Sequence, residues 1–70
     1  MKMRLKELRT SRHITQLKLA MDLNMSQNTI SRYETGEREP GLAELVKIAD
    51  YFSVSIDYLL ERTDDSRPHQ

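Results

Sequence analysis

The sequence has few of the residues on which disulfide-bonded, metal-dependent and membrane-spanning proteins depend. It contains no Cys and no Trp, and only two Gly, two Pro and two His among 70 residues. The absence of Cys excludes disulfides and thiolate metal sites. No stretch approaches the about 18 consecutive apolar residues of a membrane span, and charges interrupt the opening MKMRLKEL, unlike a signal peptide. We therefore expect a cytoplasmic chain.

The short length and the scattered histidines argue against an enzyme or a cofactor-binding protein. A chain of 70 residues is one domain or less and has little room for a cleft with its supporting shell. His13 is separated from His69 by most of the chain, and Asp64 and Asp65 fall with His69 in a polar tail that would not hold a metal in place. We expect no catalysis, no cofactor and no metal.

The net charge is zero, but the two halves of the chain carry opposite charge. Residues 1–38 contain eight Lys or Arg and four Asp or Glu, whereas residues 39–70 contain three and seven. A positive first half favours a polyanionic partner. The alternative is that ordinary solvated helix faces are segregated along the sequence by chance.

One local pattern recurs and predicts where helices begin. An apolar residue precedes a Ser or Thr, and a second apolar residue follows four positions later, as is typical of an N-cap hydroxyl with its hydrophobic staple. The pattern occurs as Ile14-Thr15 with Leu19, Met25-Ser26 with Ile30, and Val54-Ser55 with Leu59. It predicts helices that start after Thr15, Ser26 and Ser55. A fourth start is predicted at Gly41, with Glu44 at the third helical position.

Apolar residues also recur at i, i+3 and i+4 spacing, which predicts amphipathic helices. The expected helices cover residues 2–12, 16–23, 27–35, 42–52 and 56–62. His13, Asn24 and Gly36 follow the first three, and these residue types tolerate left-handed backbone at a helix end. Residues 63–70 are polar and include Pro68, so we expect a flexible C-terminal tail.

The second and third expected helices are joined by only a few residues, as in a helix-turn-helix. Ala20 is small where the two helices must approach each other, and Asn24 occupies the turn position that needs a positive φ. The residues expected on the buried side of the motif are Leu19, Leu23, Met25, Ile30 and Tyr33.

Three segments together resemble the phage Cro/cI-type helix-turn-helix family, also called XRE-like or lambda-repressor-like. They are TQLKLA at 15–20, SQNTISRYETG at 26–36, and Pro40 with Ile48-Ala49. The resemblance covers about residues 3–62 and implies an all-α, lambda-repressor-like DNA-binding domain of five short helices over residues 1–62. It further implies a homodimeric transcription regulator, most often a repressor, that reads a pseudo-palindromic operator in the major groove of double-stranded DNA.

The same resemblance places DNA contacts on and around the third helix. Amide and guanidinium groups on its exposed face suit adenine and guanine edges. The base-reading residues are expected to be Gln27, Asn28, Ser31 and Arg32. The phosphate-binding residues are expected to be Gln16, Thr29, Arg38 and Arg12. Thr29 can equally be a spectator, and the acidic neighbours Glu37 and Glu39 weaken the case for Arg38.

The resemblance also implies one structural ion pair and one dimer surface. Arg9 and Glu34 match a pair that ties the first helix to the end of the third; the alternative is two unrelated surface charges. The fifth helix is more apolar than one short helix can bury, and family members commonly dimerise at this end. The dimer surface is expected to contain Ile56, Tyr58, Leu59 and Leu60, unless all four pack inward.

A second function remains open from the sequence. The acidic half, residues 39–70, could bind another protein, as in an antitoxin-like or antirepressor-like module. Gly41, where a hydroxyl cap is usual, and the acidic neighbours of Arg38 depart from the family pattern. Reversing the charge of Glu44 or Asp57 should matter only if the acidic half has a protein partner.

Overall fold

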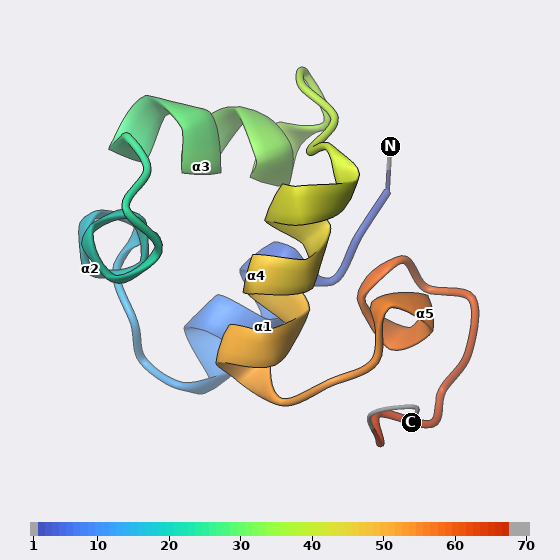
Figure 1. The fold of residues 1–70 in the computed structure, drawn as a ribbon. Helices are drawn as coiled ribbons and strands as arrows, with labels where there is room; N and C mark the ends of the chain where they lie inside the picture. The colour runs from blue at the N-terminus through green and yellow to red at the C-terminus, as the bar shows by residue number, and fades with distance from the viewer. Residues whose placement is uncertain (1, 68–70) are drawn as a thin grey trace.

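The computed structural model, which describes residues 2–67, contains five α-helices (Figure 1). They are α1 (Leu5–Ser11), α2 (Gln16–Leu23), α3 (Gln27–Thr35), α4 (Leu42–Phe52) and α5 (Ile56–Leu59). There is no strand between residues 2 and 67, so the all-α prediction is confirmed. No helix in this range is long and apolar enough to cross a membrane. The end of the expected tail, residues 68–70 with His69, lies outside the described range.

Hydroxyl side chains begin three of the helices, as the sequence predicted. The Oγ1 of Thr15 accepts from the backbone N–H of Lys18 at 3.0 Å, and the Oγ of Ser26 accepts from that of Thr29 at 3.1 Å. Ser55 caps α5 in the same way. At α4 the cap is Gly41, which has no side chain, and its own N–H donates to Glu44 Oε1 at 3.1 Å instead. These bonds satisfy backbone groups that a helix start leaves without partners.

Left-handed residues end the helices, and only some of them were predicted. His13, Asn24 and Gly36 have positive φ, which confirms their expected roles. Ser53 (φ 55°) and Glu61 (φ 62°) adopt the same backbone without a sequence signal of comparable strength. Because a left-handed residue cannot continue a right-handed helix, each of these positions fixes a turn.

The first and last helices are shorter than the sequence predicted. α1 begins at Leu5, not at residue 2, because the Arg4 backbone N–H donates to the Leu59 carbonyl at 2.8 Å and the chain before it runs beside α5. α5 ends at Leu59, not at residue 62, because Glu61 is left-handed. Both corrections arise where the two ends of the domain meet.

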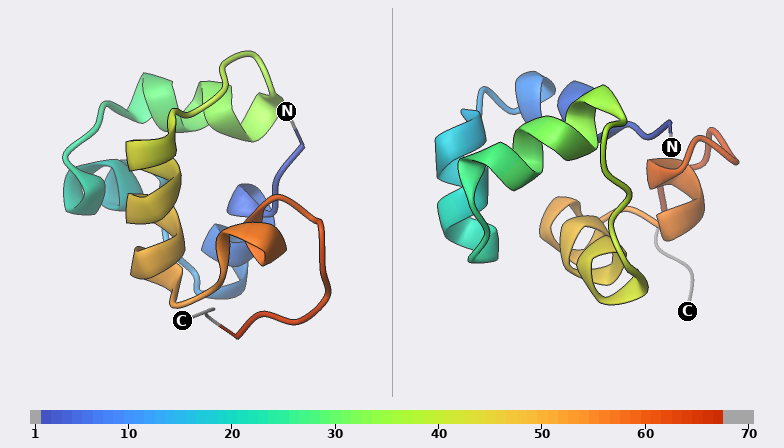
Figure 2. Two further views of the ribbon diagram at one scale, coloured as in Figure 1. Left: turned by 45° about the vertical axis from the view of Figure 1, so that its right-hand side comes forward. Right: turned by 90° about the horizontal axis from the view of Figure 1, so that it is seen from above.

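The core forms around α4, which lies between the α2–α3 pair and α5 in all three views (Figure 2). Every helix contributes to one continuous apolar cluster. Its largest fully buried side chains are those of Phe52, Leu5, Leu19, Ile30, Ile48 and Leu59. The core therefore fixes the position of α3 relative to the rest of the molecule, and this position determines what α3 can contact.

Cationic side chains from other parts of the chain cover the carboxyl ends of α2 and α4. Lys47 Nζ donates to the Leu23 carbonyl at 2.7 Å, and Arg12 Nη2 donates to the Phe52 carbonyl at 2.6 Å. Positive charge at these positions stabilises the negative end of each helix dipole. α2 and α4 have no basic residue of their own in their last turns, so these contacts depend on the tertiary fold.

The carboxylate of Asp22 joins α2 to α4 and gives the fold a pH dependence. It accepts from the Tyr51 hydroxyl and from Lys18 Nζ, and these bonds lower the pKa of Asp22, the Tyr51 bond most strongly. The same bond raises the pKa of Tyr51. Because the pKa is lower in the folded state, the ionised carboxylate stabilises that state at any pH above the ordinary carboxyl pKa of about 3.9. This stabilisation is lost as the pH falls through the lower pKa of the folded state.

We therefore expect Asp22→Asn to flatten the acid limb of the stability profile. Thermal unfolding of both proteins between neutral pH and about pH 2 measures this directly. The melting temperature of the wild type should exceed that of the variant at neutral pH, and the difference should shrink on acidification. Glu37→Gln, which removes a carboxylate from the loop after α3, is the control. Parallel profiles for the wild type and Asp22→Asn would contradict the coupling.

Candidate nucleic-acid interface

A three-residue turn, residues 24–26, joins α2 to α3 and sets the geometry of the site. Asn24 is left-handed (φ 57°, ψ 46°), and the N–H of Met25 donates to the Ala20 carbonyl at 2.8 Å. Ala20 is 1% exposed, so its small side chain lies where the helices meet. α2 is seen nearly end-on in Figure 1 while α3 runs across the view, so the two helices cross steeply. This is a helix-turn-helix, as predicted.

The two faces of α3 differ sharply in burial and in bonding. Ile30 and Tyr33 are 0% and 3% exposed and hold the inner face on the core. The outer face carries the four expected base-reading residues: Gln27, Asn28 and Arg32 are exposed and Ser31 is half-buried. Within the described part of the chain, none of these four side chains has a hydrogen bond or an ion pair. Their donors and acceptors are therefore free to meet an external surface.

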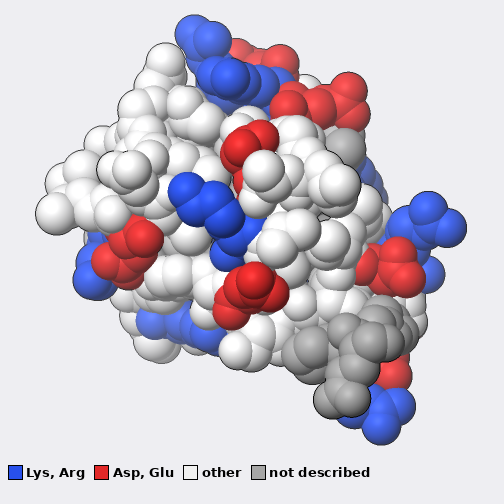
Figure 3. All heavy atoms as spheres, viewed as in Figure 1, with Lys and Arg blue, Asp and Glu red and all other residues white. Residues whose placement is uncertain are grey.

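The surface over the N-terminal half of α3 is polar but uncharged. In Figure 3 this region, at the upper left, shows neither Lys or Arg nor Asp or Glu, while charges of both signs surround it. The sequence agrees, since residues 27–31 are Gln, Asn, Thr, Ile and Ser. A surface of amides and hydroxyls can read hydrogen-bonding patterns, whereas a purely basic surface would attract any polyanion.

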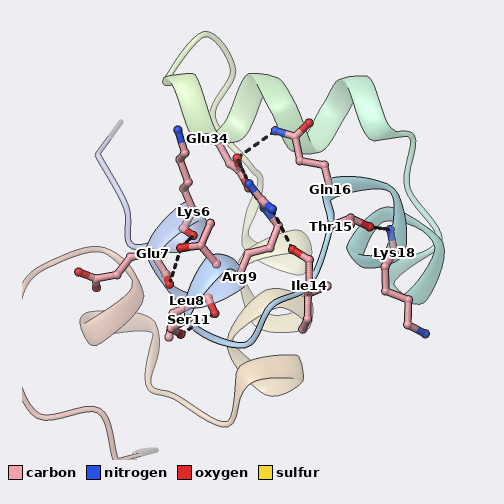
Figure 4. Close-up of polar contacts among 11 residues, drawn as sticks. Lys6, Glu7, Leu8, Arg9, Ser11, Ile14, Thr15, Gln16, Lys18 and Glu34 are labelled. Carbon is pink, nitrogen blue, oxygen red and sulfur yellow. Dashed lines mark hydrogen bonds and ion pairs between the residues drawn. The ribbon is translucent and has the colours of Figure 1, made fainter.

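A buried ion pair fixes the C-terminal end of α3 to α1 (Figure 4). Arg9 Nε lies 2.6 Å from Glu34 Oε2 and Arg9 Nη2 lies 3.1 Å from Glu34 Oε1, so the pair is bidentate. The side chains are 12% and 3% exposed. The hydrogen bond with Glu34 raises the pKa of Arg9, and Arg9 Nη1 also donates to the Ile14 carbonyl at 2.8 Å. The pair expected from the sequence is therefore present as a tightly bonded contact.

Glu34 has a second partner, which no sequence pattern indicated. Gln16 Nε2 donates to Glu34 Oε1 at 3.0 Å, which links the start of α2 to the end of α3 (Figure 4). An amide has two N–H donors and a carbonyl oxygen. Gln16 is thus held in one orientation, and its amide keeps a second N–H donor that is not used in the contact with Glu34. The two residues are 18 positions apart, and no local spacing rule pairs residues at that separation.

The other expected phosphate contacts divide into two groups. Thr29 lies in the first turn of α3, with its hydroxyl 2.8 Å from that of Ser26, and Arg38 is exposed in the loop after α3. Arg12 is elsewhere: it is bonded to the carbonyl of Phe52, and its guanidinium lies 5.1 Å from the Phe52 ring centre. This end of α4 is the one farther from α3 (Figure 1). The structure therefore places Arg12 at the C-terminal end of α4 and apart from α3, and its expected contact with phosphate stays a prediction.

Intramolecular contacts occupy much of the positive charge in the first half of the chain. Five of its eight cations have an acidic or carbonyl partner, namely Lys2, Arg4, Arg9, Arg12 and Lys18. Lys6, Arg32 and Arg38 have no such side-chain partner among residues 2–67. The cations without such a partner include one on α3 and one just after it.

The expected dimer surface is only partly accessible. Leu59 is 0% exposed, so the prediction that it belongs to this surface is corrected: its side chain packs in the core of the single chain. Ile56, Tyr58 and Leu60 are half-buried. The Arg4 guanidinium covers one face of the Tyr58 ring at 4.4 Å and also bonds the Tyr58 and Thr63 carbonyls. A smaller apolar surface remains at this end of the molecule.

Comparison with known proteins connects this geometry to one family. A family model described as helix-turn-helix matches residues 5–59. The HTH-type transcriptional regulator ImmR of Bacillus subtilis is 37% identical over 67 residues, which are 96% of this chain and 53% of ImmR. The cryptic phage CTXphi transcriptional repressor RstR of Vibrio cholerae is 38% identical over 68 residues, covering 94% of this chain and 61% of RstR.

A third relative is named as an activator. The HTH-type transcriptional activator BcrR of Enterococcus faecalis is 42% identical over 57 residues, which are 81% of this chain and 28% of BcrR. The chain spans about half the length of ImmR and less of BcrR. What these relatives share with it is the region that contains α2 and α3.

Proposed function

The chain belongs to the helix-turn-helix family of the Cro/cI, lambda-repressor-like type, and from this premise we propose that it binds double-stranded DNA sequence-specifically and regulates transcription. The observation that carries the proposal is the outer face of α3. Its four polar side chains have no partner among the described residues, and the helix beneath them is held by the core and by the Arg9–Glu34 pair. We also propose that the chain has no catalytic activity. Its proposed location is the cytoplasm, together with the DNA.

In the proposed complex the N-terminal half of α3 enters the major groove. Gln27 and Asn28 can each bond the N6 and N7 of adenine, and Arg32 can bond the O6 and N7 of guanine. Ser31 can donate or accept, so it suits either kind of edge. Each good bidentate contact is worth about 1–3 kcal/mol of discrimination between bases.

Phosphate contacts then set the orientation of α3. Gln16 at the start of α2, Thr29 at the start of α3 and Arg38 after α3 flank the base-reading face. Free backbone N–H groups at the start of α2 add donors and a partial positive charge. Such contacts give affinity and register, while the α3 side chains give sequence preference.

A dimer with two-fold symmetry completes the proposal. Ile56, Tyr58 and Leu60 offer a half-buried apolar surface at the end away from α3. Two copies joined there would present their α3 helices about 34–36 Å apart and read an inverted repeat. Repression by covering a promoter is the mode we propose, on the similarity to the repressor RstR, although the relative BcrR is an activator by name.

Salt dependence separates phosphate contacts from base contacts. We expect Arg38→Ala to weaken binding to all duplexes alike and to reduce the slope of log affinity against log salt by about 1. Gln16→Ala should also weaken all duplexes but leave the slope unchanged, because an amide displaces no counterion. Fluorescence anisotropy with labelled duplexes over a salt series measures both effects.

The control is Arg62→Ala, which removes an equal charge just after α5. It should leave both affinity and slope close to those of the wild type. Equal slopes for Arg38→Ala and the wild type would remove Arg38 from the interface. If all three variants bound like the wild type, the proposed orientation of α3 on DNA would be wrong.

A further inference from the structure

A groove lies between α4 and α5, on residues that the DNA interface does not use. Its apolar wall is formed by Val46 and Ala49 of α4, Val54 of the turn and Ile56 of α5, and two carboxylates, Asp50 and Asp57, also line it. We call this the α4–α5 groove. Its volume is about 270 Å³, which is below the usual range for a drug-sized ligand and suits one or two side chains.

The apolar wall of the groove continues onto the open surface. Val46 is 41% exposed, and Leu42, one turn earlier on α4, is 72% exposed. These are two of the four large hydrophobic side chains that are exposed in the described residues. A contiguous apolar strip that leads into a concave site is a typical feature of an interaction surface.

The charge of the groove is negative. Asp50 and Asp57 are both exposed, and Asp50 has no ion pair within residues 2–67. Asp57 Oδ1 lies 3.8 Å from Arg62 Nε, a contact between two side chains that are both more than half exposed. The neighbouring cation Lys47 is bonded to the Leu23 carbonyl on the other side of α4. An apolar groove with two accessible carboxylates is complementary to an apolar side chain with cationic neighbours.

A second copy of this chain fits the groove less well. In a two-fold dimer the same patch of both copies forms the interface. Such an arrangement through the groove would bring Asp50 and Asp57 of one copy toward the same carboxylates of the other. Like charges facing each other disfavour the contact. The occupant should therefore carry positive charge.

We propose that the α4–α5 groove binds a cationic amphipathic segment of another protein, with one bulky apolar side chain in the groove and Lys or Arg beside Asp50 and Asp57. This goes beyond DNA reading, because the groove has no residue in common with the base-reading face. It shares only Ile56 with the proposed dimer surface. The groove would also be the binding site for the protein partner that the acidic half of the sequence suggested as an alternative.

Selection of random short peptides displayed on phage, against the immobilised full chain, tests this proposal. The enriched peptides should combine a large apolar residue with Lys or Arg. Synthetic copies should bind Asp50→Asn/Asp57→Asn about fivefold more weakly, as expected for the loss of two exposed charge pairs. Val46→Arg should lower the affinity by about tenfold or more, because it fills the groove with a large side chain whose positive charge repels the Lys or Arg of the peptide.

Matched controls keep the result specific to the groove. Met21→Arg makes a comparable change at a residue that is 70% exposed on α2, and Glu37→Gln removes one carboxylate from the α3–α4 loop. Both should bind the peptides like the wild type. Amide NMR spectra of the labelled chain should show peptide-induced shifts centred on Val46, Asp50 and Ile56.

Three results would overturn the proposal. One is the absence of any enriched peptide, and another is enrichment of peptides whose binding ignores both groove variants. The third is a shift of the Val46 and Asp50 signals, which lie outside the proposed dimer surface, with protein concentration alone; it would mean that a second copy occupies the groove. DNA binding is measured separately on the same variants. If the groove proposal is wrong, the proposal that α3 reads DNA bases is therefore still tested on its own.

Discussion

Replacing Glu34 by alanine is expected to destabilise the folded chain by about 3–5 kcal/mol, because it leaves the Arg9 guanidinium largely buried without its counter-charge. Arg9 is 12% exposed and gives two hydrogen bonds to Glu34. The substitution also removes the acceptor that holds Gln16. Three helices meet at this carboxylate, so few single residues in the chain have as many structural consequences.

Urea unfolding followed by circular dichroism measures this effect as a lower midpoint with an unchanged m-value. Arg9→Met/Glu34→Met is the matched variant, since replacing both partners removes the charge together with the need to compensate it. The double variant should lose much less free energy of unfolding than Glu34→Ala alone. A loss below about 1 kcal/mol for Glu34→Ala would class the pair with exposed surface ion pairs and contradict its structural role.

Replacing Gln27 or Arg32 by alanine is expected to weaken binding to the preferred duplex by about 5- to 150-fold each, which corresponds to about 1–3 kcal/mol. Both side chains are exposed and unbonded within the described chain, so stability should change little. Arg32→Ala should lose its preference at one base position. Its binding to unrelated duplexes should fall only by the loss of one charge.

The control for this pair is again Arg62→Ala, measured on the same matched and single-mismatch duplexes. It should keep the full discrimination between them. If Gln27→Ala and Arg32→Ala discriminate as well as the wild type, another surface reads the sequence. If the variants melt well below the wild type, part of their lost affinity reflects unfolding. In that case the test is their discrimination among duplexes, measured below the melting temperature of the variants.

Local chemistry explains why much of the fold was predictable. The caps at Thr15, Ser26 and Ser55 and the turn at Asn24 involve groups within about four residues of each other. Bonds of that range leave a pattern in the sequence. The ends of α2, α3 and α4 were therefore predicted correctly, and with them the helix-turn-helix.

Contacts between distant residues explain the parts that were not predicted. Arg12 bonds Phe52 and Arg4 bonds Tyr58, at separations of 40 and 54 residues. No spacing rule connects such pairs, so the place of Arg12 at the end of α4 was not predicted and residues 2–4 looked like helix. Leu59 looked like surplus apolar surface for the same reason, since its burial depends on where α5 packs.

The charge of the first half shows the same difference between sequence and structure. Summed along the sequence, it indicated a polyanion partner, but helix caps and ion pairs occupy five of its eight cations. The stronger indication of DNA reading is the outer face of α3, whose N-terminal half is polar and uncharged, with Arg32 in its second half and Arg38 in the loop after it. Affinity from phosphate should therefore be moderate, and base contacts should carry a large share of specificity.

Selection of bound duplexes from a random DNA pool, with purified chain at one stated salt concentration, tests the central proposal most directly. Reading by α3 in a two-fold dimer predicts recovery of an inverted repeat whose half-site centres lie about 10–10.5 base pairs apart. A single enriched half-site would retain the α3 reading and remove the preformed dimer. No enriched sequence, with binding that only fades as salt rises, would contradict sequence-specific reading by this chain.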